Sequence, residues 1–209
     1  MQIQTTNSYL SATGAISHNM TNDYMFRYIL QKNEKVLRGL ICSLLHLNPK
    51  TIESITIQNP INLAEDISAK DFISLFPDYP EFYATYKLLN VKNHHLYSSK
   101  FTLSVIDLNQ TTLATDEDKA YGIDYWAKLF KAKTWEELKM LAKDNEYLDA
   151  AANSLYEANA DWMVRERCIA RKLAERRERT LERDIKLLKE ENSDLKDRIK
   201  ELEEQLLQK

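Results

Sequence analysis

From Asn145 to its last residue the chain contains neither glycine nor proline. Because these two residues are the usual breakers of helices, their absence favours one long helix over residues 145–209. Within it leucine recurs at every seventh position, which is the spacing of a coiled-coil seam. We expect a leucine-zipper-like coiled coil from about residue 173. Its dimerisation residues at the a and d positions are Leu181, Ile185, Leu188, Asn192, Leu195, Ile199, Leu202 and Leu206.

The residue types along this seam predict a parallel homodimer. Isoleucine at a with leucine at d favours two parallel strands, and the single asparagine at a selects register and the dimeric state. In a parallel dimer each g residue faces the next e residue of the partner, and three such pairs are opposite in sign. They are Asp184 with Lys189, Glu191 with Lys196, and Arg198 with Glu203. The alternative interpretation is a single solvated helix with mixed charges.

A basic segment, residues 165–183, comes directly before the zipper. Basic helices that continue into a zipper are how basic-zipper proteins enter the major groove of DNA. Four glutamates interleave with the basic residues and would cancel about half of the charge available to phosphates. A DNA-contacting helix and a solvated charged face therefore both stay open. The candidate DNA contacts are Arg165, Arg167, Arg171, Lys172, Arg176 and Arg177.

The first 144 residues predict an α+β domain. Residues 1–20 are polar and aperiodic, as in a flexible N-terminal tail, and the domain covers residues 21–144. Thr21-Asn22-Asp23 offers N-cap residues before a segment with helical spacing, YMFRYILQ, and a second helix is expected over residues 34–47. Alternation with Ile55 and Ile57 on one side predicts a strand over 52–58, and residues 82–91 and 100–108 predict an antiparallel hairpin. Further helices follow from residue 115, with Thr115 and Thr134 as N-cap candidates and a capping box expected between Thr134 and Glu137. The expected sheet is small, mixed or antiparallel, with three strands.

Composition narrows the class of protein. The net charge is −3 and the pI about 5.9, which excludes binding to nucleic acid through bulk positive charge. Any binding to nucleic acid would need a local basic patch. The two cysteines, Cys42 and Cys168, match no metal-binding spacing and indicate small apolar residues in a reducing compartment. The N-terminus lacks a basic segment followed by an apolar one, and no run of 18 apolar residues occurs. We expect a cytoplasmic protein without membrane contact.

Motifs that would reveal an enzyme are missing from the sequence. There is no glycine-rich phosphate loop, no His-Glu-x-x-His and no Cys-x-x-Cys. His94 and His95 are adjacent on a predicted turn, which indicates a solvated pair more than a metal site. The residues alone therefore assign no catalytic, metal-binding or cofactor-binding position.

Five sequence blocks resemble one family. The blocks are TNDYMFRYIL (21–30), VLRGLICSLLHLNP (36–49), the block from residue 52 to 72, LFPDYPEFYATYKL with its continuation to residue 108, and DKAYGIDYWAKLF (118–130) with the following helix. Together they are similar to the Rpn-type recombination-promoting nuclease and transposase family. This family belongs to the PD-(D/E)xK nuclease superfamily. The resemblance covers nearly all of residues 20–160. It implies a reduced PD-(D/E)xK-like domain followed by a long charged helix.

The resemblance also implies a loss of catalysis. In the family, the stretch like ISAKDF continues into two strands that carry an Asp and a Glu-x-Gln or Glu-x-Lys, which hold Mg²⁺. Here Phe72 is followed almost directly by the proline-rich segment at Pro77, so about the middle third of the domain is missing. Asp71 corresponds to the residue leading into the lost strand, and Asp23 to a position near the family's active site. We therefore expect an internally deleted, inactive member without a cofactor.

Three interpretations follow for the whole chain. The first is a catalytically silent member of the nuclease family. The second is a non-enzymatic dimeric binding or regulatory module, acting through its coiled coil on DNA or on a full-length homologue. The third is a remnant without a stable fold.

Overall fold

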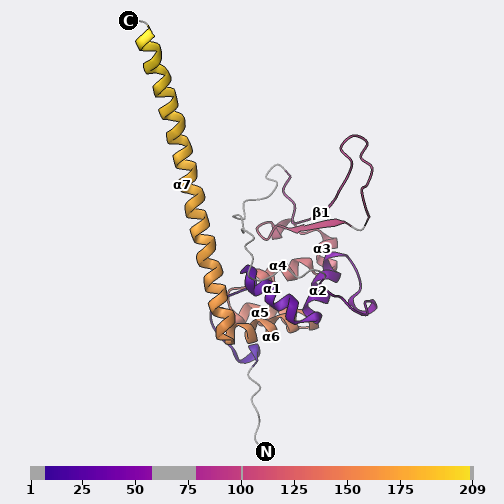
Figure 1. Ribbon diagram of the computed structural model, residues 1–209. Helices are drawn as coiled ribbons and strands as arrows, with labels where there is room; N and C mark the ends of the chain where they lie inside the picture. The colour runs from indigo at the N-terminus through magenta and orange to yellow at the C-terminus, as the bar shows by residue number, and fades with distance from the viewer. Residues whose placement is uncertain (1–7, 58–78, 100, 208–209) are drawn as a thin grey trace, which may run out of the picture.

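The computed structural model describes residues 8–57, 79–99 and 101–207, with side chains as far as residue 200 (Figure 1). This part of the chain forms seven α-helices and one two-stranded antiparallel sheet. The expected α+β class, with a small antiparallel sheet and a long C-terminal helix, is therefore confirmed. The elements are α1 (Asp23–Lys32), α2 (Glu34–Leu44), β1 (Tyr83–Lys87), β2 (Thr102–Ile106), α3 (Asp116–Ala120), α4 (Ile123–Lys131), α5 (Trp135–Ala142), α6 (Glu146–Ala160) and α7 (Trp162–Leu207), with short 3-10 turns at Tyr9–Ser11, Pro49–Thr51 and Thr111–Leu113.

The helices begin where the sequence places capping residues. The side chain of Asn22 accepts a hydrogen bond from the third residue of α1, at 3.1 Å. Thr115 caps α3 in a reciprocal capping box with Asp118. Thr134 caps α5, but its expected box is altered, because Glu137 accepts from the backbone N–H of the residue before the cap. Each cap satisfies N–H groups that have no partner within the helix.

Helix α6 lies at the centre of the core and contacts α1, α2, α5 and α7. It buries Leu148, Leu155 and three alanines, whose small side chains let neighbouring helices approach. Helix α2 approaches α6 closely at Gly39, where an added Cβ would lie 2.5 Å from Cβ of Tyr147. Glycine at this position therefore sets the distance between the two helices.

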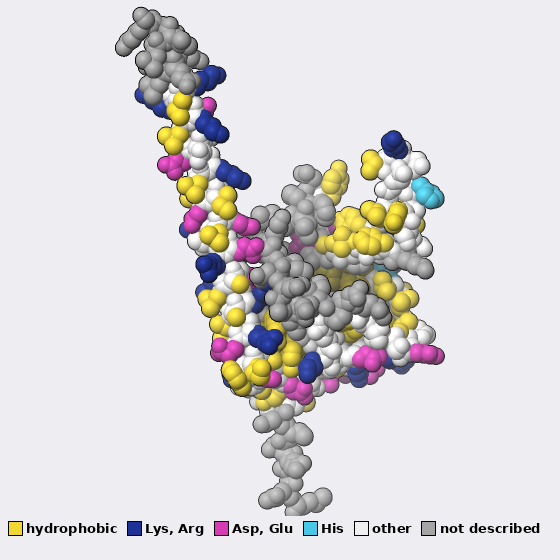
Figure 2. Space-filling model, in the orientation of Figure 1, with side chains coloured by type: hydrophobic (Ala, Val, Ile, Leu, Met, Phe, Trp, Pro, Cys, Tyr) yellow, Lys and Arg dark blue, Asp and Glu magenta, His cyan; other side chains and the backbone are white. Residues whose placement is uncertain are grey.

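The two-stranded sheet pairs Tyr83 with Ile106 and Tyr86 with Leu103. Tyr83 and Ile106 pack on a small cluster that includes Phe82 of the preceding turn, buried to 2% exposure. The outer face carries Tyr86 and Leu103, which are 37% and 54% exposed. Figure 2 shows this apolar group on the upper surface of the body.

The N-terminal segment is more ordered than the expected flexible tail. Within residues 8–20, Tyr9 and Met20 are each only 3% exposed. The Tyr9 hydroxyl donates to Asp149 Oδ1 at 2.6 Å, and Trp135 N donates to the Gly14 carbonyl at 3.0 Å. A segment without its own periodicity is held here by bonds to α5 and α6, which no local pattern can reveal.

The strand expected over residues 52–58 is wrong for residues 52–57, and residue 58 lies outside the described chain. Ile55 packs against the helical core, and Ile57 is 39% exposed. Alternation shows which residues can share a face, but a strand also needs a neighbour to complete its hydrogen bonds. Within the described residues the sheet therefore has two strands, not the expected three.

The single helix expected from residue 145 is divided at Asp161. Its backbone is extended there, with φ −75° and ψ 118°. The Asp161 carboxylate accepts from Met163 N at 2.8 Å and from Val164 N at 3.4 Å, so it caps α7. The direction changes because α6 buries its apolar side in the core while α7 packs on α1. A break without glycine or proline is thus made by a capping aspartate.

Candidate functional site: the faces of the C-terminal helix

Helix α7 is anchored to the body by its first four turns. Val164 and Cys168 are 2% and 0% exposed, and the Cys168 carbonyl accepts from Asn22 Nδ2 at 3.3 Å. Arg171 Nε lies 3.7 Å from Asp23 Oδ2 and 3.3 Å from Glu175 Oε1. These contacts fix the direction in which the helix leaves the body.

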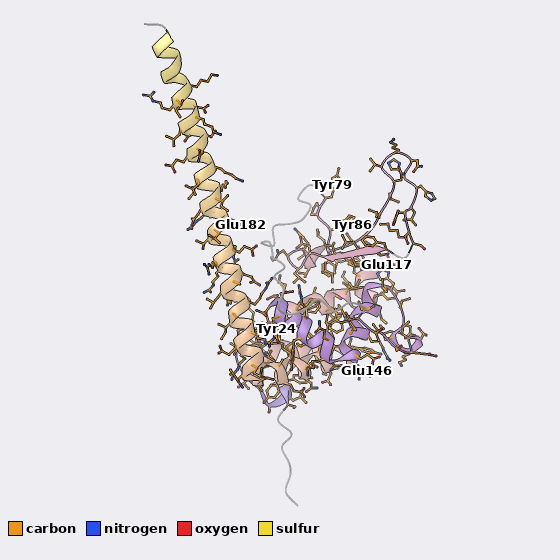
Figure 3. All side chains as sticks on the ribbon, in the orientation of Figure 1. Tyr24, Tyr79, Tyr86, Glu117, Glu146 and Glu182 are labelled. Carbon is orange, nitrogen blue, oxygen red and sulfur yellow. The ribbon has the colours of Figure 1, made fainter. Side chains whose placement is uncertain are left out.

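Beyond this anchor the helix projects into solvent (Figures 1 and 3). Every residue from Arg179 to Lys200 is exposed. At 1.5 Å per residue, the part from Arg179 to Leu207 is about 40 Å long. An isolated helix that carries an apolar stripe this far from its own core leaves that stripe available to a second molecule.

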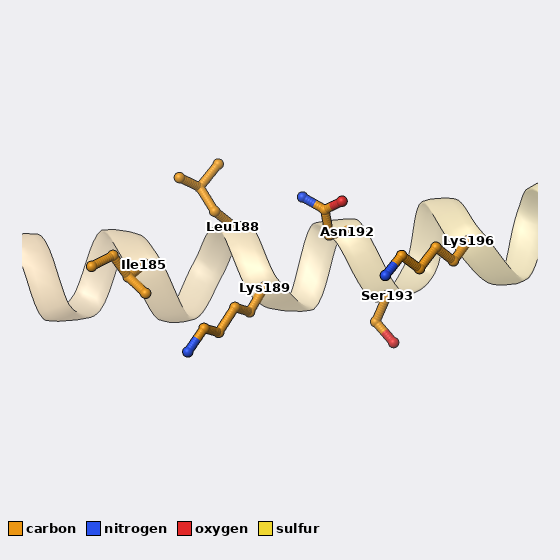
Figure 4. Close-up of a pocket in the computed structure, with 6 residues that line it drawn as sticks. All are labelled: Ile185, Leu188, Lys189, Asn192, Ser193 and Lys196. Atoms are coloured by element: carbon orange, nitrogen blue, oxygen red, sulfur yellow. The ribbon is translucent and has the colours of Figure 1, made fainter.

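The exposed stripe contains the predicted zipper residues. Leu181, Leu188 and Leu195 are 54%, 57% and 56% exposed, and Ile185 and Ile199 are 51% and 55% exposed. Figure 4 shows Leu188 and Asn192 projecting from the same side of the helix, whereas Lys189 projects to the other side. The side chains of Leu202 and Leu206 lie outside the described residues. The dimer that these residues predict stays a prediction.

The zipper stripe and the anchor use different faces of α7. The four anchor residues of α7 are Val164, Cys168, Arg171 and Glu175. At 100° per residue around the helix axis, their mean direction differs by about 110° from that of the exposed a and d residues. A second helix can therefore pack on the stripe without displacing α1. Arg171, two heptads before Ile185 at an a position, is used in ion pairs with Asp23 and Glu175 and so belongs to the anchor.

The six candidate DNA contacts fall on three faces. The Arg167 guanidinium lies 5.8 Å from the Tyr24 ring centre and Arg171 pairs with Asp23, so these two serve the anchor. Arg177 is exposed beside the zipper seam. The remaining three, Arg165, Lys172 and Arg176, are exposed on the side of the helix opposite the seam.

That opposite side is purely basic over its first half. Helical spacing adds three cations to this side that are not among the six candidate contacts. They are Arg179, Arg183 and Lys186, which lie 14, 18 and 21 residues after Arg165. The interleaved glutamates lie on other faces. Glu175, Glu178 and Glu182 are on the side of α7 that faces the body, and Glu166 is at the edge of the seam that lies away from the body. The basic ridge consists of Arg165, Lys172, Arg176, Arg179, Arg183 and Lys186. Its signal was present in the sequence, but counting charges along the chain concealed it.

The base of the basic ridge affects a histidine of the N-terminal segment. Burial lowers the pKa of His18, and the positive charges of Lys172 and Arg165 lower it further. Asn159 Oδ1 accepts from His18 N at 3.0 Å, so the segment is held against α6 at this point. The two cations are thus close enough to act together on a neighbouring charge.

Of the two acidic positions that the family resemblance singles out, the structure describes only Asp23, which is held in ion pairs. Asp23 Oδ1 pairs with Arg27 Nε at 2.8 Å and its other oxygen faces Arg171. Asp71 lies outside the described residues. His94 and His95 are exposed on the hairpin loop. Over residues 8–57, 79–99 and 101–200, no group of three His, Cys, Asp or Glu side chains has an arrangement that would hold a metal ion.

Both cysteines behave as apolar core residues. Cys42 and Cys168 are free thiols, each 0% exposed. Burial raises the pKa of the Cys168 thiol to about 11, which keeps it protonated at neutral pH. The expectation of small apolar residues is confirmed.

No family model, curated protein or solved structure matches this chain. Among the described helices, none combines the length and the apolar composition that crossing a bilayer requires.

Proposed function

We propose that this chain is a non-catalytic binding module that pairs with a second copy through a parallel coiled coil of α7. The observation that carries the proposal is the apolar stripe of Leu181, Ile185, Leu188, Leu195 and Ile199, each more than half exposed on a helix beyond its own core. Burial of such a stripe against a second copy is the ordinary way in which a heptad sequence becomes stable.

Three further features support a defined dimer over a loose association. Asn192 interrupts the stripe at an a position, where a buried amide favours a partner asparagine in register. The g and e residues of two parallel copies are opposite in sign at three successive positions. The anchor on α1 keeps the body about 110° away from the seam, so two bodies can stand on either side of the paired helices.

The proposal includes descent from the Rpn-type nuclease and transposase family, with loss of the strands that carry the metal ligands. What supports it is the resemblance of the quoted blocks and the short connection between Phe72 and Pro77 in the sequence. In this view the body presents the coiled coil, and a full-length homologue with the same heptads is an alternative partner for α7. The compartment that we propose is the cytoplasm.

Sedimentation equilibrium of the full chain tests the dimer. We expect the mass of two chains at micromolar concentration, and a monomer at tens of micromolar would overturn the proposal. A plasmid-nicking assay with Mg²⁺ or Mn²⁺ tests the loss of catalysis. We expect no cleavage, whereas cleavage that co-purifies with the chain and is abolished by a substitution in it would contradict this part.

A further inference from the structure

We propose that the basic ridge of α7 binds the phosphate backbone of double-stranded DNA. This inference names a partner for the dimeric module proposed above. It depends on a face of the helix that the dimer does not use, so the two proposals can be tested separately.

Positive and negative charges are segregated around the first half of α7. Residues 162–189 contain ten basic and five acidic residues, and along the chain the two kinds alternate closely. On the helix they separate, because six of the cations share one face within about 80° and the acids lie on other faces. Two residues of the ridge have contacts with other residues. Arg183 Nε lies 3.9 Å from Asp184 Oδ1, which is a loose ion pair, and Arg179 also has an interaction.

The length and width of the ridge match those of a DNA contact. From Arg165 to Lys186 it extends about 31 Å along a straight rod, which corresponds to about nine base pairs of duplex at 3.4 Å each. A single helix is also about as wide as the major groove of B-DNA. The ridge therefore presents a regular line of positive charge to a regular line of negative charge.

The ridge carries charge without apolar residues of its own. Protein interfaces depend on buried apolar anchors, and membrane-surface helices need an apolar face along their length. The six side chains of the ridge are all cationic, and the nearest exposed apolar side chains, Ile169 and Leu187, lie at its edge. Cations without such anchors fit a polyanion whose binding is driven by the release of counterions.

The ridge remains accessible in the dimer. Its mean direction is about 180° from the mean direction of the a and d residues, so a partner helix covers the opposite side of α7. The face of α7 opposite the seam is basic as far as Lys186. Beyond Lys186 the same face carries Glu190 and Asp197 and is acidic. This change of sign limits the contact to the half of α7 nearest the body.

The test compares two charge-matched variants of the full chain by fluorescence anisotropy with a labelled mixed-sequence DNA duplex. The ridge variant is K172Q/R176Q/R183Q/K186Q. The control is K50Q/K87Q/K92Q/K143Q, which removes four exposed cations from the body. Circular dichroism checks that both variants fold, and sedimentation checks that both keep the oligomeric state of the parent.

We expect the parent to bind the duplex at low salt with a strong salt dependence. The ridge variant should bind at least about tenfold more weakly, with the slope of log affinity against log salt reduced by about 3 to 4. The control should bind within about twofold of the parent. No binding by the parent, or an equal loss in both variants, would overturn the inference, as would a preference for anionic lipid vesicles or duplex RNA over duplex DNA.

Leu188→Glu separates this inference from the proposed dimer. If the variant becomes monomeric and still binds duplex through the ridge, both proposals hold. If the parent is monomeric and binds duplex, the dimer is wrong and the ridge inference stands.

Discussion

Replacing Leu188 by glutamate, with Leu187 as its neighbouring control, is the sharpest test of the coiled coil. The two leucines are adjacent and almost equally exposed, at 57% and 56%. Leu188 is at a d position and Leu187 at a c position, so only the first faces a second copy in a parallel dimer. Charge change, residue type and exposure are matched, and only the position relative to the seam differs.

The magnitude follows from the exposed surface. Full burial of a leucine side chain contributes about 1.5–3 kcal/mol, so covering the exposed half of Leu188 contributes about 1–1.5 kcal/mol. One layer of the dimer contains two copies, which gives about 2–3 kcal/mol. Two facing carboxylates add repulsion and desolvation, so we expect at least about 3–4 kcal/mol in total, or a dissociation constant several hundredfold higher.

Sedimentation velocity over a concentration series measures this shift. Leu188→Glu should sediment as a monomer where the parent is a dimer, and Leu187→Glu should match the parent, because exposed substitutions outside an interface change free energies by about 0.5 kcal/mol or less. Equal dissociation of both variants would show that the contact does not follow the heptad. An unchanged Leu188→Glu dimer would place the interface elsewhere.

Other substitutions probe the register, the core and the two titratable groups. Asn192→Leu should shift the dimer toward higher oligomers, as seen by light scattering, because the buried amide no longer restricts the oligomeric state. Gly39→Ala should lower the free energy of unfolding in urea by about 1–3 kcal/mol, because its Cβ would meet Tyr147, and a gain from better helix propensity would refute the close approach. The pKa of His18 is lower in the folded than in the unfolded state. The free energy of unfolding is therefore unaffected above the unfolded pKa near 6.5 and falls as the pH decreases below it. His18→Gln should reduce the fall in this free energy between about pH 7.5 and 5.5. Cys168 should resist alkylation at about pH 8 until the chain unfolds, as located by mass spectrometry, since burial keeps its thiol protonated.

Most of the local structure was predictable because its causes lie within a few residues. Asn22, Thr115 and Thr134 cap helices whose first N–H groups are close in sequence, and the hairpin follows from two apolar segments joined by a polar connection. The zipper residues were equally visible, since a heptad is a property of one helix. The basic ridge was equally predictable, because 100° per residue places its six cations on one face of a helix and the interleaved glutamates on other faces.

The sequence by itself determined the helices, their caps, the hairpin and the apolar seam of α7, because each depends on periodicity or on contacts between near neighbours. Only the tertiary structure decided that Tyr9 is buried, that residues 52–57 form no strand, and that the long helix is divided at Asp161. Tyr9 depends on a partner 140 residues away, and a strand depends on a neighbour to pair with. The break at Asp161 is capped locally, but its place follows from the packing of α7 on α1. It also decided which cations anchor α7 and which remain at its surface, because Arg171 is defined by Asp23 on another helix.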